Sequence, residues 1–221
     1  MLKITTPYPY KEFKRKSVGG KRLYENPYGD PVPSVTTILS KTKDMTHLNA
    51  WKKRVGEKKA QEIVTEAASV GTVMHEILEA WSLNKEYTGK NMLQAKMMAE
   101  TVIKNVEADI DEVWGSEVNL CYPQLYAGTT DLVGIYKGRP TIMDFKQTNR
   151  PKKREWIDDY FMQASAYAMA HNEVFETKIE HAAIFMCSRD CDWQLWEIGP
   201  AEFEQWTEKW AKRVEEFYNL S

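Results

Sequence analysis

The stretch "YAGTTDLVGIYKGRPTIMDFKQT", residues 126–148, predicts a β-hairpin. Apolar and β-branched residues fill both halves, as is typical of strands, and "KGR" supplies the connection. A tight turn centred on Lys137–Gly138 places Asp131 opposite Asp144. Directly opposed residues of an antiparallel pair have Cβ atoms roughly 4.5–5.5 Å apart. The hairpin is therefore expected to bring two carboxylates together on one face.

Lys146 lies on the same face as Asp144, because side chains alternate along a strand. Two neighbouring acids repel each other, and burying either one without compensation is costly, so a divalent cation would stabilise the pair. Mg²⁺ prefers oxygen ligands, and a lysine beside it would orient or deprotonate an attacking water or neutralise charge on the phosphorane. The pattern thus favours phosphodiester hydrolysis. The alternative is a surface hairpin with a solvated Asp–Lys salt bridge.

Composition sets the limits for this interpretation. The chain has 221 residues, 43% of them hydrophobic, which fits one large domain or two small ones with a real core. A formal net charge of −2 gives no overall basic signature, so a nucleic-acid binder would have to concentrate its cations locally. The 3 cysteines lack paired C-x-x-C spacing, and no apolar run is long enough for a membrane span or a secretory signal. These features predict a cytoplasmic protein without disulfides.

The order of patterns predicts an α/β fold with a central mixed β-sheet flanked by helices. Residues 1–33 suggest an irregular arm with at most one short hairpin, 34–116 a helical region, and 117–221 an α/β core, all in one compact domain. Within the helical region, Ser34 is expected to cap a helix, a long helical pattern over 48–83 to break at Gly71, and a further helix to span 92–114. The core is expected to begin with three strands and to continue through a helix, two strands and a final helix opened by Pro200.

Four motifs in order carry a resemblance to a known family. "GTVMHEILE" (71–79), "YAGTTDLVG" (126–134), "IMDFKQT" (142–148) and "QASAY" (163–167) resemble the PD-(D/E)XK nuclease superfamily, in its RecB-like and Cas4-like exonuclease branch. "VPSVTTILSKT" and "LNAW" look most like the mitochondrial genome maintenance exonucleases and related phage exonucleases. The resemblance covers roughly residues 31–170 and implies a restriction-endonuclease-like core.

The resemblance implies a catalytic set and a metal site. Asp131 matches the aspartate of the G-x-x-D motif, and Asp144 and Lys146 match D-x-K. The implied ligands of Mg²⁺ or Mn²⁺ are His75, Asp131, Asp144 and the main-chain carbonyl of Phe145. An imidazole among carboxylates suits Mn²⁺ better than an all-oxygen site.

The same resemblance suggests residues for the substrate. Gln163 and Tyr167 match a Q-x-x-x-Y helix that approaches the scissile strand, and the basic run carrying Arg150, Lys152 and Lys153 follows the D-x-K strand directly. Cations in "KEFKRK" (11–16), at Lys52–Arg54 and at Lys58–Lys59 are further candidates for phosphate contacts, and aromatic residues of the N-terminal arm and Trp51 for base contacts. A charge run is also common on a merely solvated face.

Other acids and the cysteines refine the expected metal site. Glu117 lies where several members of the branch keep an acid. "HEILE" resembles the zinc-protease pattern H-E-x-x-H, but Glu79 occupies the position of the second histidine, so a zinc protease is not favoured. Iron–sulfur members of the branch use four cysteines, so no cluster is expected here.

The sequence as a whole predicts a metal-dependent DNA exonuclease that acts on single strands or duplex ends, in replication, recombination or repair. Two alternatives remain: a structure-specific flap or junction endonuclease, and a non-catalytic nucleic-acid-binding protein of the same fold. A phage origin would fit the compact size only by analogy.

Overall fold

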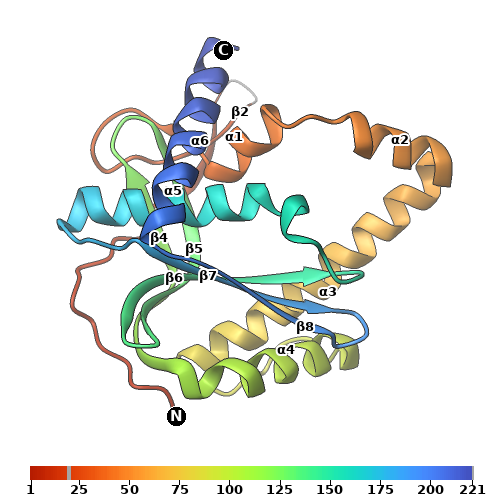
Figure 1. Ribbon diagram of the computed structural model, residues 1–221, viewed down its shortest axis with the longest axis horizontal. Coiled ribbons are helices and arrows are strands. Elements are labelled where there is room, and N and C mark those ends of the chain that lie inside the picture. Colours follow the sequence, from red (N-terminus) through yellow and green to blue (C-terminus); the bar gives the residue numbers. More distant parts are fainter. Residues whose placement is uncertain (19–20, 221) are drawn as a thin grey trace.

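A computed structural model describes residues 1–18 and 21–220 (Figure 1). Its centre is a five-stranded sheet in the order β4-β5-β6-β7-β8. Neighbouring strands are antiparallel except β6 and β7, which are parallel and are connected through a helix. The strands are β4 (Ile110–Tyr122), β5 (Tyr126–Tyr136), β6 (Arg139–Thr148), β7 (His181–Ser188) and β8 (Trp193–Ile198). The α/β fold with a mixed central sheet is confirmed.

Helices cover both faces of this sheet (Figure 1). One apolar cluster joins α1, α5 and α6 to one face, and a second joins α3 and α4 to the other. The helices are α1 (Val35–Lys41), α2 (Thr46–Val55), α3 (Glu57–Ser82), α4 (Leu93–Val106), α5 (Asp158–Phe175) and α6 (Pro200–Asn219), with 3₁₀ turns η1 (Glu107–Asp109) and η2 (Arg154–Trp156). None of the helices in the described ranges is both long and apolar enough to cross a membrane.

The N-terminal segment forms a second, small sheet beside the first. Strands β1 (Arg15–Val18), β2 (Lys21–Tyr24) and β3 (Val32–Pro33) pair antiparallel, so the expected hairpin is present, and its turn at 19–20 lies outside the described residues. Ser34 caps α1 as expected, with its side chain accepting a hydrogen bond from the Thr37 backbone N–H. The division of the chain at 33/34 and 116/117 stays a prediction.

Two expectations about the helical region are wrong. The long helical pattern breaks at Gly56, where φ is +86°, and α3 then runs without interruption through Gly71. A glycine inside a helix weakens it only modestly, whereas a positive φ is a backbone state that glycine adopts readily. The helix expected over 92–114 ends at Val106, and strand β4 starts at Ile110. Pairing with β5 decides this boundary, because Val113 is fully buried in the sheet.

The central feature of the sheet is a fork between β5 and β6. Their pairing runs from Tyr136–Arg139 to Leu132–Met143 and then stops. Beyond this point β5 continues beside β4 as far as Tyr126, while β6 continues beside β7 as far as Thr148. The two strands therefore diverge, and the residues that follow Leu132–Met143 in each strand line the opening.

Candidate active site

Asp131 and Asp144 lie at the point where β5 and β6 separate. The predicted turn register is correct, since Tyr136 pairs with Arg139. Ladder pairing stops one step before Asp131 and Asp144, and the backbone N–H of Phe145 instead donates a 2.7 Å hydrogen bond to Oδ2 of Asp131. A carboxylate thus satisfies an amide that would otherwise lack a strand partner. This bond fixes the orientation of Asp131 at the fork.

Asp144 and Lys146 form an ion pair on the face of the sheet that α5 covers. Asp144 is only 2% exposed. Burial, supported by the charge of Asp131, raises the pKa of Asp144 to about 6, although Lys146 opposes this shift. Burial would lower the pKa of Lys146, but the charges of Asp144 and Asp131 outweigh it, so the pKa lies above its ordinary value. Lys146 is therefore held as a cation.

His75 reaches the same acids from α3. Its Nδ1 lies 3.4 Å from Oδ1 of Asp131, and the edge of its ring faces Phe145. Burial tends to lower the pKa of His75, but the charge of Asp131 and a bond to it raise the pKa overall. Burial would raise the pKa of Asp131, but the charge of His75 and the hydrogen bond to it lower this pKa below its ordinary value. An element distant in sequence thus completes the polar cluster.

Glu117 is the third acid at the fork. Ser116 pairs with Leu132 and Val118 with Thr130, so Glu117 lies across β4–β5 from Asp131. Its φ of +51° is a left-handed conformation that non-glycine residues seldom adopt inside a strand and that often marks functional sites. Burial of the carboxyl and the charge of Asp131 raise the pKa of Glu117 to about 7. The loose sequence match at this position therefore coincides with a strained residue beside the predicted acids.

The donor set of the cluster fits a divalent cation. Ligand atoms of His75, Glu117 and Asp131 all lie within 4.8 Å of one another. The amide and carbonyl of one residue in an extended strand point to the same side, so the carbonyl of Phe145 faces Asp131, as its N–H does. One imidazole with several oxygens is a donor set that Mn²⁺ accepts and that Mg²⁺ tolerates. Desolvation is the main cause of the raised pKa of Glu117, and the second cause, the negative charge of Asp131, is one that a cation would offset.

A groove gives solvent access to this cluster. It has a volume of about 660 Å³ and lies between α3 and the ends of the diverging strands. Its walls include Gly71, His75, Glu117, Lys146 and Gln147, and also Arg15 from β1. A side chain at Gly71 would project toward Gln147, at ordinary contact distance from its Cβ. An alanine would therefore fit at this position, where α3 passes beside β6 at the floor of the groove.

Helix α5 carries Gln163 and Tyr167, which lie beside Asp131 and Asp144. The Gln163 amide donates a 3.2 Å hydrogen bond to the Tyr167 hydroxyl. Tyr167 is buried and packs against Gly128 of β5, where an added Cβ would lie 2.6 Å from the ring. Burial raises the pKa of Tyr167, with a further contribution from the charges of Asp144 and Asp131. Tyr167 therefore supports the half-exposed Gln163.

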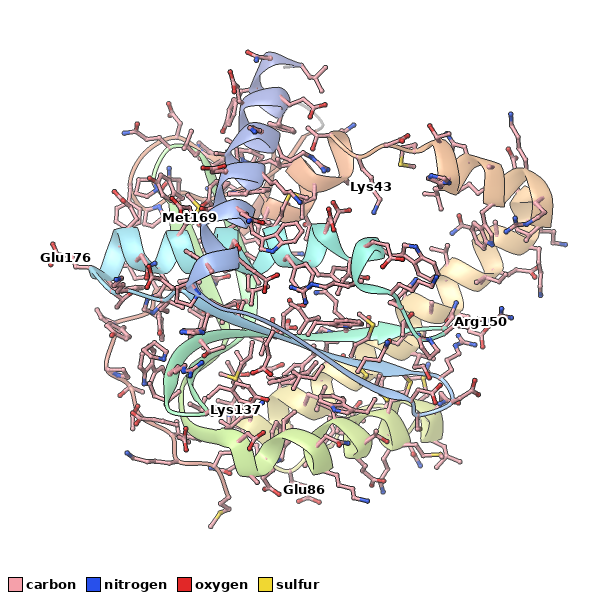
Figure 2. The ribbon with its side chains drawn as sticks, in the orientation of Figure 1. Lys43, Glu86, Lys137, Arg150, Met169 and Glu176 are labelled. Carbon is pink, nitrogen blue, oxygen red and sulfur yellow. The ribbon has the colours of Figure 1, made fainter. Side chains whose placement is uncertain are left out.

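The predicted basic run forms the connection from β6 to α5. Figure 2 shows Arg150 at the end of β6 that lies away from the Lys137 turn. Lys152 is held through its backbone, whose N–H and carbonyl both bond to the Gln194 side chain, at 2.7 and 2.8 Å. Lys153 places its amine 5.4 Å from the centre of the Trp156 ring. The basic run therefore lies directly beyond the end of β6, the strand that carries Asp144 and Lys146.

One residue at the site, Tyr160, is not identifiable from the sequence, and a second, Arg15, belongs to a basic segment that the sequence offers as a candidate for phosphate contacts. Tyr160 presents its ring to the Lys146 amine, with 5.0 Å from the amine to the ring centre. Arg15 reaches the groove from the N-terminal hairpin. The segment around Arg15 is visibly basic in the sequence, but its position depends on how the small sheet sits beside β5. Tyr160 belongs to none of the motifs.

Two curated exonucleases are similar to the chain. Over 205 residues, 84% of this chain and 58% of the relative, it is 27% identical to mitochondrial genome maintenance exonuclease 1 of Homo sapiens. Over 172 residues, 72% of this chain and 49% of the relative, it is 27% identical to the protein of the same name from Xenopus tropicalis. The chain thus spans about half of the length of these curated relatives. They confirm the exonuclease resemblance that the motifs predict.

The other comparisons are more distant. No family model matches the chain. A solved structure from Eubacterium rectale that carries a provisional exonuclease name is 11% identical, with a TM-score of 0.44 over 68% of each chain. A score of this size is too low to support either the fold or the function.

Proposed function

We propose that this chain is a metal-dependent nuclease of the PD-(D/E)XK type that hydrolyses phosphodiester bonds of DNA. The observation that carries the proposal is the convergence of Asp131, Asp144 and Lys146 at the fork of β5 and β6, with His75 reaching Asp131 from α3. A binding surface for phosphate would gain nothing from clustered acids. The same cluster is useful when a cation separates the acids from the substrate.

The metal would be held by His75, Asp131, Asp144 and the carbonyl of Phe145, with Glu117 beside them. A bound Mg²⁺ or Mn²⁺ supplies charge stabilisation for the phosphoryl oxygens and favours a nucleophilic hydroxide. The protein orients these donors before substrate arrives, because the Phe145 amide fixes Asp131 and Lys146 pairs with Asp144. Such preorganisation lowers the cost of assembling the site.

Lys146 has several roles in this proposal. Its raised pKa favours the ammonium form, which stabilises negative charge and orients a water but does not accept a proton. Because a bound cation would offset the charges of Asp144 and Asp131 that raise this pKa, the proposal keeps the three roles of Lys146: orienting a water, deprotonating it and neutralising charge. The Tyr160 ring beside the amine supports the same charged form through a cation–π contact.

The substrate would follow cations that lie around the groove. Helix α2 buries none of its described side chains, and its last turn carries Lys52, Lys53 and Arg54. Figure 1 shows α2 apart from the central sheet, attached to the start of α3. Together with the basic run at 150–153, this helix would give phosphates a path to the acids. Such local cations would serve although the whole chain has a net charge of −2. Exonuclease action is the mode that the relatives' names favour, and we propose single strands or duplex ends as the substrate.

Digestion of defined DNA tests this proposal. End-labelled single-stranded and duplex DNA should be degraded with Mg²⁺ or Mn²⁺ and should remain intact in EDTA. An exonuclease will leave circular single-stranded DNA uncut, whereas a flap or junction endonuclease releases a fragment from a branched substrate. Binding of DNA without any metal-dependent cleavage would contradict the nuclease and favour the non-catalytic alternative.

A further inference from the structure

A solvent-exposed tryptophan stands at the connection from β6 to α5. Trp156 is 61% exposed, although tryptophan has a large apolar ring that usually contributes to a core or an interface. By contrast, Trp206 and Trp210 of α6 are 8% and 0% exposed and belong to the core. An exposed ring of this size marks a surface that gains stability when something covers it.

The surroundings of Trp156 are basic. The Lys153 amine lies 5.4 Å from the centre of the Trp156 ring, and Arg150 precedes it in the same connection. A flat apolar ring beside cations suits a ligand that offers a π-face and a negative charge together. An unpaired nucleotide has both, since its base stacks on the ring and its phosphate pairs with the cations.

The backbone around Trp156 is held in place. The Gln194 side chain bonds to both the N–H and the carbonyl of Lys152, and Arg154 pairs with Glu202 and covers the Phe161 ring at 4.6 Å. The N–H of Trp156 itself donates to the carbonyl of Lys153 at 3.0 Å. A ring on an anchored turn loses little conformational entropy when a ligand binds.

The position of Trp156 connects it to the candidate active site. Four residues later, beyond the junction at Ile157 between η2 and α5, Tyr160 contacts the Lys146 amine, and four residues of chain span at most about 14 Å. Trp156 therefore lies within reach of a nucleotide near the one being cut. Three of the arm aromatics predicted for stacking are less suitable, since Tyr24 is buried and Tyr8 and Tyr10 pack on His171.

We propose that Trp156 is a stacking platform for an unpaired base of the substrate and that it gives the enzyme its preference for single-stranded DNA. This proposal rests on the proposed nuclease function. Bases in a duplex are stacked on each other and offer no free face, so the platform favours a single strand or a frayed end. Lys153 and Arg150 hold the adjoining phosphates.

Trp156→Ala tests the platform, with Trp156→Phe as the variant that keeps a ring. Binding of a thymidine oligonucleotide is measured in EDTA, which prevents cleavage, alongside oligonucleotides that carry one abasic site at successive positions. Stacking of one base is worth about a 5- to 140-fold change in affinity. The alanine variant should lose affinity in this range, and the phenylalanine variant should recover most of it.

The abasic series gives the sharper readout. In the wild type one abasic position should weaken binding, and in Trp156→Ala that position should lose its effect. Leu93→Ala is the matched control, because Leu93 is 70% exposed at the start of α4 and should change nothing. Thermal unfolding should be unaltered in all three variants, since both positions are exposed.

Two negative results are distinguishable. If wild-type protein cleaves DNA, and Trp156→Ala binds single strands like the wild type with an unchanged abasic profile, the platform is wrong and the nuclease stands. If wild-type protein neither binds nor cleaves DNA, the proposed function fails and the platform fails with it.

Discussion

Asp131 accepts a 2.7 Å hydrogen bond from the backbone N–H of Phe145, so a side chain replaces a strand partner where β5 leaves β6. The bond ties the acid of one strand to the backbone of the next at the point where their ladder ends. Without the separation, Asp131 and Asp144 would face each other across a continuous sheet.

Asp131→Asn should separate the structural role of this residue from its charge. The asparagine carbonyl can still accept the Phe145 bond, so the fold and the thermal unfolding midpoint should be nearly unchanged. The lost negative charge should lower the cleavage rate by about a thousandfold, because metal-ion stabilisation is worth several kcal/mol. Rates with Mg²⁺ and calorimetric metal titration measure the effect. Glu204→Gln, an exposed carboxylate on α6, should leave both unaltered.

Lys146→Ala should abolish cleavage while DNA binding persists, since the proposed DNA path includes other cations, among them Lys52, Lys53 and Arg54. Lys146→Arg should retain more activity than the alanine variant, because arginine keeps the positive charge but does not act as a base. Single-turnover rates and binding in EDTA measure the two properties. Lys104→Ala on the exposed side of α4 is the control. Full activity of Lys146→Ala would remove this residue from the mechanism.

Replacement of Lys52, Lys53 and Arg54 by alanine should weaken single-strand binding and make it less sensitive to salt. The slope of log affinity against log salt should fall by about 0.7 for each phosphate that the protein no longer neutralises. The fold should persist because α2 buries none of its described side chains. The matched control replaces Lys90, Lys96 and Lys104, an equal loss of charge on the α4 side. Equal effects of the two triple variants would indicate a general charge effect and would contradict a path along α2.

His171 should make the fold sensitive to acid. It is fully buried, and burial lowers its pKa to about 4. The Thr177 hydroxyl donates to Asn172, so it accepts from Nδ1–H of His171, and Nε2 is left to accept from the Tyr10 hydroxyl. The neutral ring therefore satisfies both partners, and a protonated ring would lose the bond from Tyr10.

The pH range follows from the direction of this shift. The unfolded chain takes up a proton near pH 6.5, before the folded protein does, so this contribution to stability is complete above pH 6.5 and disappears as the pH falls toward 4. Its full size is about 3 kcal/mol. Urea unfolding at pH 7 and pH 4.5 should show the loss in the wild type. His171→Gln should be less stable at pH 7 but should show a smaller difference, whereas exposed His47→Gln should behave as the wild type. If His171→Gln shows the same stability difference between pH 7 and pH 4.5 as the wild type, a group other than His171 causes the acid sensitivity.

Much of the β5–β6 hairpin was predictable because its determinants are local. Alternation of side chains and a turn at Lys137–Gly138 fix the register, and the predicted facing of Tyr136 and Arg139 is observed. The Ser34 cap and the Pro200 helix start are local signals in the same sense. Of the two helix errors, the first concerns which glycine adopts a positive φ, Gly56 instead of Gly71. The second arose where a neighbouring element decides, because pairing with β5 takes Ile110–Trp114 into β4.

The sequence by itself determined the chemical identity of the candidate site: two acids and a lysine on one hairpin face, with a motif histidine upstream. Only the tertiary structure decided how they meet. The fork, the strained backbone that brings Glu117 across from Asp131, the approach of His75 from α3 and the contact of Tyr160 with Lys146 all depend on packing between segments far apart in the chain. Periodicity specifies which face a side chain occupies, because that depends on backbone geometry within one element. Distances between elements depend on how they pack, and no single segment carries that information.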